Sequence, residues 1–353
     1  MSTSPQPSPS GRSGGPSRPS RRGLLAVGGA LGLGGLLTAC GGGSSDKADK
    51  ASGAGADSGS WTFKDDRGET ARTKKTPKQV VAFTGTAAAL HDFGFECAAV
   101  FGPTELKDGK PDPQAGDLDI GKVTILGNAW GEFNVEKYAA LAPDLLVTNM
   151  LQGSELWYVP DGSKKKILAL APSVGINVTK VSLTKVIGRY AELAGSLGAD
   201  LKAKKVTDAK ARFEKASETL RKAARDKKGL KVLCASGSAD LLYVSDPAVY
   251  ADLAYFRSLG VEFVVPGKVT GGFFESLSWE NAGKYAADVI LLDNRTAALQ
   301  PKDLEAKPTW AGLPAVKAGQ ITPWLSEPRY SYAGCAPLVE RLAAAIEKAE
   351  KVS

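Results

Sequence analysis

The chain has 353 residues, a formal net charge of +7 and 24% charged residues. Residues 1–39 contain four arginines and no acidic residue, so their removal lowers the net charge to +3. The remaining charges of both signs are interspersed, which excludes the basic stripe expected of a nucleic-acid-binding protein. The single histidine, His91, excludes the common His-rich metal sites and leaves one candidate base for a Ser-His or Cys-His pair.

The first forty residues have the pattern of an export signal. An acid-free start with several arginines precedes a glycine-rich apolar stretch at 24–37, which is shorter than the about 20 residues of a spanning helix. The stretch ends in Leu37-Thr38-Ala39-Cys40, which resembles the lipobox of bacterial lipoproteins and implies that Cys40 is acylated and becomes the N-terminus. The pair Arg21-Arg22 resembles a twin-arginine export signal, and an ordinary secretory signal is the alternative. We therefore expect a signal peptide at 1–39 and anchoring to the outer face of the cytoplasmic membrane.

The segment after the predicted lipidation site is expected to be a tether. Residues 41–60 consist of Gly, Ser, Ala, Asp and Lys, with no large apolar residue. Such a segment cannot bury enough surface to offset its chain entropy. We expect the lipidated cysteine and a flexible linker at 40–60, with a reach of roughly 25 Å.

Three further cysteines, Cys97, Cys234 and Cys335, lie far apart in the sequence and in largely apolar surroundings. An odd number allows at most one disulfide and leaves one thiol over. Buried free thiols are the favoured interpretation.

Short apolar strands alternate with helices in the first part of the folded region. Because this alternation is typical of a parallel sheet covered by helices, we expect an N-terminal lobe at 61–182. His91 lies near the end of one of these helices and is interpreted as a helix-end or hinge-surface residue rather than a catalyst. The predicted strands are 79–83, 98–101, 123–126 and 144–148, and the predicted helices are 86–93 and 134–141.

The middle of the chain is almost continuously helical from 184 to 225, with a break predicted at 195–198. The second part, 199–226, contains neither Gly nor Pro, and a helix of that length spans about 42 Å. We expect a connecting backbone helix region at 183–228 that joins two lobes. A long surface helix on a single domain and a coiled coil are the alternatives.

The alternation resumes after Gly229 and predicts a C-terminal lobe at 229–353. Its expected strands are 231–235, 241–244, 262–265 and 288–292, with helices inside 245–259 and at 332–351. The predicted fold class is therefore α/β, with two Rossmann-like lobes of mostly parallel sheets joined by a long rigid helix.

A weak internal repeat supports the two lobes. Glu136 and Glu280 are each expected in a helix's first turn, eight residues before Asp144 and Asp288, which open buried strands. The pairs Gly94-Phe-Glu96 and Gly260-Val-Glu262 also correspond, because each ends a helix before a strand.

These features together resemble the ABC-transporter substrate-binding proteins with a helical backbone, which bind iron siderophores, haem and cobalamin. The resemblance runs from about Trp61 to the C-terminus. Residues 61–68 are similar to the family's N-terminal hairpin, 75–81 to its first strand entry and 309–319 to its late tryptophan-containing segment. The segment from Asn134 to Pro143-Asp144-Leu145 is the most specific match.

The resemblance implies that each lobe carries a surface glutamate that pairs with arginines of a membrane permease. By position in the repeat, these are Glu136 and Glu280. Favourable interaction of a first-turn glutamate with the helix dipole is the structural alternative.

Aromatic residues dominate the loops that are expected to face the ligand. Single aromatic residues belong more often to a core, as expected for Trp279 and Trp310, but exposed aromatic pairs in polar loops need a partner. A guanidinium hydrogen-bonds hydroxamate oxygens with fixed geometry, which makes Arg329 the best cationic donor, although pairing with Glu327 is the alternative. The arginine that relatives often place in the loop corresponding to 127–133 is absent, and Trp130 stands there. The candidate ligand-binding residues are Trp130, Phe133, Trp157, Tyr158, Tyr243, Phe273, Phe274, Arg329, Tyr330 and Tyr332.

Aromatic walls with few charges suit a nearly neutral hydroxamate siderophore, such as a ferrioxamine, better than citrate-type or catecholate ligands. The resemblance implies a monomeric, non-enzymatic binding protein of an ABC importer. It implies no resident cofactor and no metal ligand, because the cargo is a preformed Fe(III)–siderophore complex. A haem or cobalamin binder of the same fold, a secreted lipoprotein hydrolase and a protein that binds a bare metal ion are the alternatives.

Overall fold

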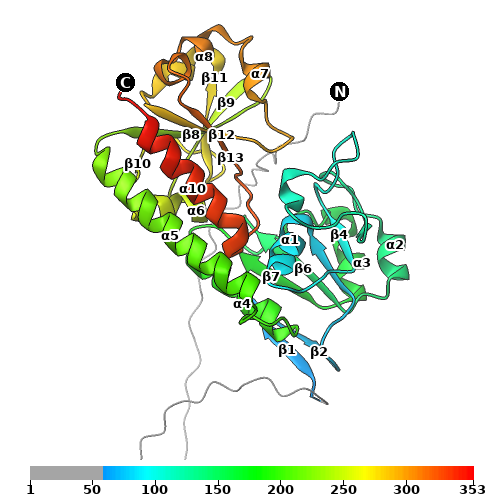
Figure 1. Ribbon diagram of the computed structural model, residues 1–353. Helices are drawn as coiled ribbons and strands as arrows, with labels where there is room; N and C mark the ends of the chain where they lie inside the picture. The colour runs from blue at the N-terminus through cyan, green and yellow to red at the C-terminus, as the bar shows by residue number, and fades with distance from the viewer. Residues whose placement is uncertain (1–58) are drawn as a thin grey trace, which may run out of the picture. The chain divides into compact units, whose positions relative to one another are not determined.

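A five-stranded parallel sheet forms the centre of the N-terminal lobe in the computed structural model, which describes residues 59–353 (Figure 1). The strand order β5-β4-β3-β6-β7 has β3 in the middle, where all four of its residues are buried. The predicted signal peptide, Cys40 and nearly all of the linker lie outside the described residues. The elements of this lobe are β3 (Val80–Phe83), α1 (Thr84–Asp92), β4 (Ala99–Phe101), η1 (Pro113–Ala115), β5 (Thr124–Ile125), α2 (Val135–Ala140), β6 (Leu145–Met150), α3 (Asp161–Leu170) and β7 (Ser173–Asn177).

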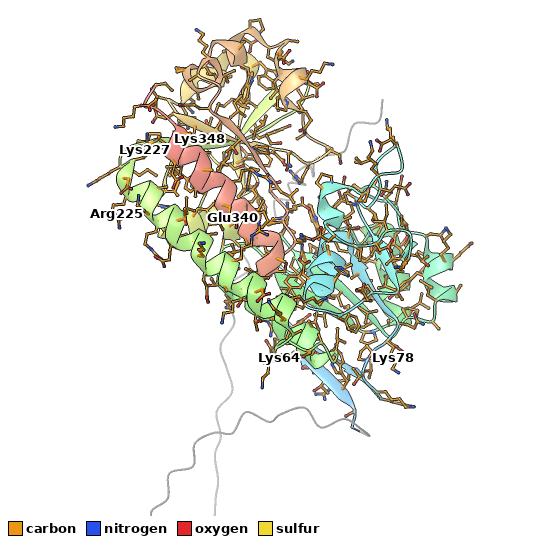
Figure 2. All side chains as sticks on the ribbon, viewed as in Figure 1. Lys64, Lys78, Arg225, Lys227, Glu340 and Lys348 are labelled. Atoms are coloured by element: carbon orange, nitrogen blue, oxygen red, sulfur yellow. The ribbon has the colours of Figure 1, made fainter. Side chains whose placement is uncertain are left out.

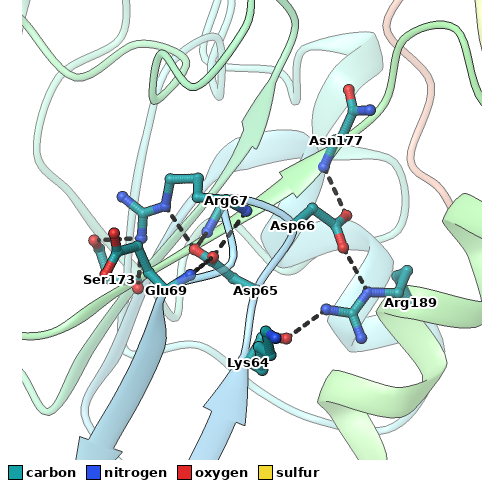
Figure 3. A network of polar contacts seen from close by, with 9 residues as sticks. Lys64, Asp65, Asp66, Arg67, Glu69, Ser173, Asn177 and Arg189 are labelled. Atoms are coloured by element: carbon teal, nitrogen blue, oxygen red, sulfur yellow. Dashed lines mark hydrogen bonds and ion pairs between the residues drawn. The ribbon is translucent and has the colours of Figure 1, made fainter. Parts of the chain in front are cut away.

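An antiparallel hairpin of β1 (Trp61–Lys64) and β2 (Thr70–Thr73) precedes this sheet, as the sequence resemblance indicated. Its turn is tied to the lobe by two carboxylates (Figure 3). Asp65 accepts hydrogen bonds from the Arg67 side chain and from the Gly175 amide, while Asp66 accepts one from Arg189 at 2.9 Å. The hairpin is therefore fixed both to β7 and to the helix that follows it.

Two helices lead from the first sheet to the second. These are α4 (Leu183–Ser196) and α5 (Lys204–Asp226), and α5 has 23 residues, or about 34 Å at the usual rise. The helix expected at 199–226 thus begins five residues later, because the Asp200 carboxylate accepts a hydrogen bond from the Lys202 amide and closes a turn there. Gly195 lies inside α4, and the chain leaves that helix through Gly198 at φ +101°.

The second sheet forms the centre of the C-terminal lobe and has the order β11-β9-β8-β12-β13, with β10 paired to the first half of β8. Strands β8, β10, β12 and β13 pair in parallel, whereas β9 pairs in antiparallel fashion with both of its neighbours, β8 and β11. The elements are β8 (Lys231–Gly237), β9 (Leu241–Ser245), α6 (Ala251–Ser258), β10 (Glu262–Phe263), β11 (Phe274–Ser278), η2 (Trp279–Lys284), β12 (Val289–Asp293), α7 (Pro301–Leu304), α8 (Pro308–Gly312), α9 (Pro314–Lys317), β13 (Ile321–Trp324) and α10 (Tyr332–Lys348).

The predicted fold class, two α/β lobes with mostly parallel sheets and a long helix between them, is confirmed. Helices α5 and α10 lie side by side (Figure 1). The Arg212 guanidinium on α5 binds the Glu340 carboxylate on α10 at 2.7 and 2.6 Å, and Figure 2 shows Glu340 midway along this pair. The Phe213 ring on α5 stacks on Tyr255 of α6, which joins the long helix to the second lobe.

The internal repeat is also present in three dimensions. The Asp144 carboxylate accepts hydrogen bonds from the amides of Lys78 and Gln79 at the start of β3, and the Asp288 carboxylate accepts one from Lys231 at the start of β8. Each aspartate therefore fixes the first residues of the central strand beside it.

One hydrophobic core runs from the first sheet, through α4, α5 and α10, to the second sheet. The three cysteines within residues 59–353 are buried free thiols, as expected. Burial raises the pKa of each thiol, so they remain protonated at neutral pH. No helix among the described residues is long and apolar enough to cross a membrane.

Candidate functional site

The two lobes touch where the loops after several strands of each sheet meet, the usual place for a ligand site in α/β proteins. Trp157 Nε1 donates a hydrogen bond to Glu327 Oε2 at 3.0 Å, and Thr296 Oγ1 donates one to Asp112 Oδ2 at 3.0 Å. Arg329 Nη2 binds Asp117 Oδ2 at 2.8 Å. We call the residues that make these contacts, together with the charged side chains paired with them (Asp92, Asp293 and Arg295), the seam.

Three rings of the N-terminal lobe form a cluster beside the seam. The centroid of Trp130 lies 4.9 Å from that of Trp157 and 5.0 Å from that of Tyr158, and those two lie 5.6 Å apart. Trp130 is 47% exposed, which is unusual for a residue of its size. These rings present an accessible aromatic surface, and we call them the tryptophan cluster.

The backbone of Tyr158 is held in an unusual conformation. Its φ of +61° lies in the left-handed region, which costs free energy for a residue with a side chain. Gly102, at φ +99°, makes room for the ring beneath it, because a Cβ there would lie 2.6 Å from the Phe83 ring and 3.4 Å from the Tyr158 ring. Strain of this kind persists where the surroundings impose it, and such positions cluster at binding sites.

A second group of rings belongs to the C-terminal lobe. Tyr243 contacts Phe274 at a centroid distance of 4.8 Å, and Tyr250 contacts Phe273 at 6.0 Å. Gly271 and Gly272, at φ +63° and +82°, set the turn that brings both phenylalanines to this place. Tyr250, which the sequence analysis did not select, also pairs with Thr179 of the other lobe as an isolated bridge.

The loop that carries these phenylalanines is fixed at its base by Glu275. The Glu275 carboxylate accepts hydrogen bonds from the Gly267 amide and from the Tyr285 hydroxyl, and it pairs with the Lys284 ammonium. The Lys284 and Tyr285 side chains lower the pKa of Glu275 to about 2, so it is ionised at every physiological pH.

Arg295 is the principal residue that sequence reasoning missed. Its guanidinium binds Asp293 at the end of β12, with Nη2 to Oδ2 at 2.7 Å, and also binds Glu327. Burial lowers the pKa of Arg295, but the two carboxylates outweigh it and hold the pKa above its usual value. An arginine two residues after the aspartate that ends a buried parallel strand was the available signal.

Arg329, the cationic donor predicted from sequence, is engaged between the lobes. Its Nε lies 3.3 Å from Asp92 Oδ2, and the Asp117 carboxylate binds its Nη2. Gly116 and Gly334 enclose it, because a Cβ at either position would collide with the Arg329 side chain. Within residues 59–353, the buried Nη1 has no hydrogen-bond partner. Burial raises the pKa of Asp92, although Arg329 opposes the shift.

The other predicted residues differ in their surroundings. Tyr330 is 5% exposed and stacks on Tyr190 at 6.1 Å, and the half-buried Tyr332 packs against Phe93 and Phe213 of the core. Phe133 packs against Phe101 and Tyr138 on the outer side of the first sheet. The structure therefore places Trp130, Trp157, Tyr158, Tyr243, Phe273 and Phe274 in the two ring groups and these three residues in packing contacts.

Glu136 and Glu280 are both exposed, in the first turns of α2 and η2, as the repeat predicted. The second element is a short 3-10 helix rather than an α-helix. A hydrogen bond from Ser278 lowers the pKa of Glu280, so this carboxylate is ionised at neutral pH.

Two further observations limit the chemistry of the described region. His91 lies in the last turn of α1 and its Nδ1 pairs with Glu96 at 2.7 Å, as expected of a helix-end residue. Among residues 59–353, no group of three or more His, Cys, Asp or Glu side chains is arranged to hold a metal ion.

A family model described as "Periplasmic binding protein" matches residues 87–328. The structure is similar to that of DesE, a ferric-siderophore receptor protein from Streptomyces coelicolor, with 56% identity and a TM-score of 0.81 over 83% of this chain and 100% of that chain. It is also similar to the petrobactin-binding protein YclQ of Bacillus subtilis, with 19% identity and a TM-score of 0.63 over 82% and 99% of the two chains. FeuA, a triscatecholate siderophore binding protein of Bacillus subtilis, gives 17% identity and a TM-score of 0.60 over 81% and 97%. The last two likenesses concern the fold alone. No curated protein matches the chain.

Proposed function

The chain belongs to the periplasmic binding protein family, and from this premise we propose that it captures an Fe(III)–hydroxamate siderophore of the ferrioxamine kind for an ABC importer. The identity of 56% with DesE, a ferric-siderophore receptor, supports the cargo class. The tryptophan cluster is the observation that carries the choice of ligand. Exposed rings held close together offer apolar contact to a bulky complex whose shell is only weakly charged.

The cations of the seam favour a hydroxamate over an anionic siderophore. Arg295 is already bound by Asp293 and Glu327, and Arg329 by Asp92 and Asp117. A triply negative catecholate complex requires free guanidinium or ammonium groups to replace its hydration. A neutral ferric hydroxamate requires only a few donors and a large apolar contact.

In this proposal the iron is fully coordinated by the siderophore, which is cargo and not a resident cofactor. The protein contacts the ligand shell through Trp130, Trp157, Tyr158, Tyr243, Phe273 and Phe274. Tyr250 joins this set because it touches Phe273. Arg295 acts indirectly, because it binds the Glu327 carboxylate that also accepts the hydrogen bond from Trp157.

The remaining parts of the proposal concern delivery. Cys40 carries the lipid that anchors a monomer to the outer face of the cytoplasmic membrane, after export by the general or the twin-arginine route. Glu136 and Glu280 contact the permease, one from each lobe. Their exposure and their equivalent positions in the repeat support this role.

Quenching of tryptophan fluorescence tests the proposal, because Trp130 and Trp157 lie in the candidate site. The protein is titrated with ferrioxamine, a ferric catecholate, haem and cobalamin. We expect saturable quenching by ferrioxamine at submicromolar concentration and at least tenfold weaker binding of the others. Tight binding of haem or cobalamin without binding of ferrioxamine would overturn the proposal in favour of another ligand class. Turnover in an esterase screen would indicate a hydrolase.

A further inference from the structure

We infer that the seam selects its ligand by charge, favouring a ferric complex with a positively charged side chain over a neutral one and rejecting a negatively charged one. This inference rests on the proposed function and specifies its substrate class. Five carboxyl groups and two guanidinium groups lie along the seam, and all of them except Asp112 take part in ion pairs with one another. They are Asp92, Asp112, Asp117, Asp293, Glu327, Arg295 and Arg329.

The carboxylates exceed the cations in both halves of this arrangement. Arg295 is shared by Asp293, which is fully buried, and Glu327, which is 6% exposed. Asp112 is 4% exposed, its side chain accepts from the Thr296 hydroxyl and the Gln114 amide, and it makes no ion pair among residues 59–353. Arg329 is likewise shared by Asp92 and Asp117.

The excess negative charge lies next to the ring groups. Tyr158 is close enough to Glu327, Arg295 and Asp112 for all three to act on its hydroxyl electrostatically. Tyr250 is under the same influence from Arg295, Asp293 and Glu327. A ligand on these rings therefore meets a field set mainly by carboxylates, and fields of one sign act strongly beside low-dielectric protein.

Neither guanidinium is within easy reach of an incoming anion, because the one nitrogen without a hydrogen-bond or ion-pair partner among residues 59–353, Arg329 Nη1, is buried. An anion at Arg295 would have to displace Asp293, whose two oxygens both contact the guanidinium. An anion at Arg329 would have to enter between Gly116 and Gly334, where the side chain is only 14% exposed. A ligand ammonium, in contrast, finds acceptors with unused lone pairs.

Three matched ligands test the inference. They are the ferric complexes of one linear tris-hydroxamate whose end is a free amine, its N-acetyl derivative and its N-succinyl derivative, with net charges of about +1, 0 and −1 at neutral pH. Dissociation constants are measured by fluorescence quenching on the protein without its signal peptide and lipid. We expect affinity to fall in that order, by about tenfold in total at low ionic strength, and the differences to shrink at 0.5 M salt because charges are screened.

Two variants locate the source of any preference. Asp117→Asn removes one seam carboxylate that is 74% exposed, so the variant should fold normally. It should reduce the ratio of the dissociation constants of the succinyl and the amine ligand at least twofold. Asp208→Asn makes the same charge change on α5, where the carboxylate is 61% exposed, and should leave this ratio of dissociation constants unchanged.

The outcomes separate this inference from the proposed function. Binding of all three ligands with equal affinity, or tightest binding of the succinyl derivative, overturns the charge selection while the hydroxamate function stands. An equal reduction of the ratio by both variants assigns the preference to net charge and also overturns the role of the seam. Failure of all three ligands to bind overturns the proposed function itself.

Discussion

Trp157 and Glu327 are 170 positions apart in the sequence and joined by a hydrogen bond of 3.0 Å from the indole nitrogen to the carboxylate. The bond links the tryptophan cluster of one lobe to the Arg295 network of the other. Glu327 thereby binds both the Trp157 ring of the N-terminal lobe and the half-buried Arg295 guanidinium of the C-terminal lobe. The orientation of the aromatic surface depends on the relative position of the two lobes.

Trp157→Phe keeps a ring but removes the donor of this bond. We expect ferrioxamine affinity to fall about fivefold, because Glu327 loses a partner and the ring loses its fixed orientation. The measurement is a fluorescence titration followed through the remaining tryptophans. Trp61→Phe is the control, because it also removes an indole donor. The Trp61 indole, in the N-terminal hairpin, donates a hydrogen bond of 3.1 Å to the Ser196 carbonyl at the end of α4. Equal affinities in the two variants would contradict the link.

Gly102→Ala tests the room made for Tyr158. The added Cβ would lie 2.6 Å from the Phe83 ring and stand at φ +99°, so we expect a loss of about 3 kcal/mol in the free energy of unfolding. Gly153→Ala is the matched control, because Gly153 has φ +56° but no atom within 4 Å of the added Cβ. Its backbone strain alone should cost about 1 kcal/mol. Urea unfolding compares the two, and similar losses would show that the contact with Phe83 is unimportant.

Arg295→Met leaves two buried carboxylates without their cation. We expect a loss of about 3–5 kcal/mol in the free energy of unfolding, the usual consequence of breaking a buried ion pair from one side. Arg212→Met removes the guanidinium that binds Glu340, where the side chains are 55% and 40% exposed, and should cost less than about 1 kcal/mol. If denaturant unfolding gives the two variants equal losses of unfolding free energy, Asp293 and Glu327 are not charged carboxylates that depend on Arg295.

Helices and strands with a uniform local composition were predicted from the sequence. Elements that depend on partners far away in the sequence were missed. The apolar run of β3 and the alanine-rich α10 are local signals. Strand β13 contains Pro323, which argues against a strand, but it lies at a sheet edge and pairs only with β12, where proline is tolerated.

The candidate site shows the same limit. Aromatic pairs in polar loops were visible as a local pattern, and both pairs lie in the ring groups. The partners of Arg329 were not visible, because Asp92 and Asp117 precede it by more than 200 positions. Tyr330 and Tyr332 seemed equivalent to loop residues in the sequence, but the start of α10 turns them towards Tyr190 and Phe213.

Asp252 gives the protein a specific dependence on pH. It is 1% exposed, and burial raises its pKa from 3.8 to about 6, although the Trp324 indole donates to it at 2.7 Å. Between these two values the folded state binds more protons than the unfolded state, so stability falls as pH rises through this window. The pKa shift of Asp252 lowers the free energy of unfolding by about 3 kcal/mol across this window.

Asp252→Asn should remove this part of the pH dependence. The amide oxygen still accepts from Trp324, so the variant should gain stability relative to the parent as pH rises from 4 to 7. Thermal or urea unfolding at several pH values measures the difference between the two proteins, which cancels the other titrating groups. A difference that stays constant across the range would show that Asp252 does not titrate there.

Substitution of Glu136 and Glu280 distinguishes ligand capture from delivery to the permease. Because both are exposed and lie outside the ring groups and the seam, the double variant Glu136→Gln, Glu280→Gln should bind ferrioxamine with unchanged affinity. Uptake of radioactive iron by cells that depend on the protein should fall at least tenfold, since two long charged side chains that meet permease arginines are neutralised.

Glutamine keeps the size of each side chain, so a loss of uptake at unchanged stability points to charge and not to helix capping. Glu214→Gln on α5, where the carboxylate is 63% exposed, is the control. If uptake survives in the double variant while its unfolding free energy drops, the two glutamates stabilise their helix ends and do not dock the protein on a permease.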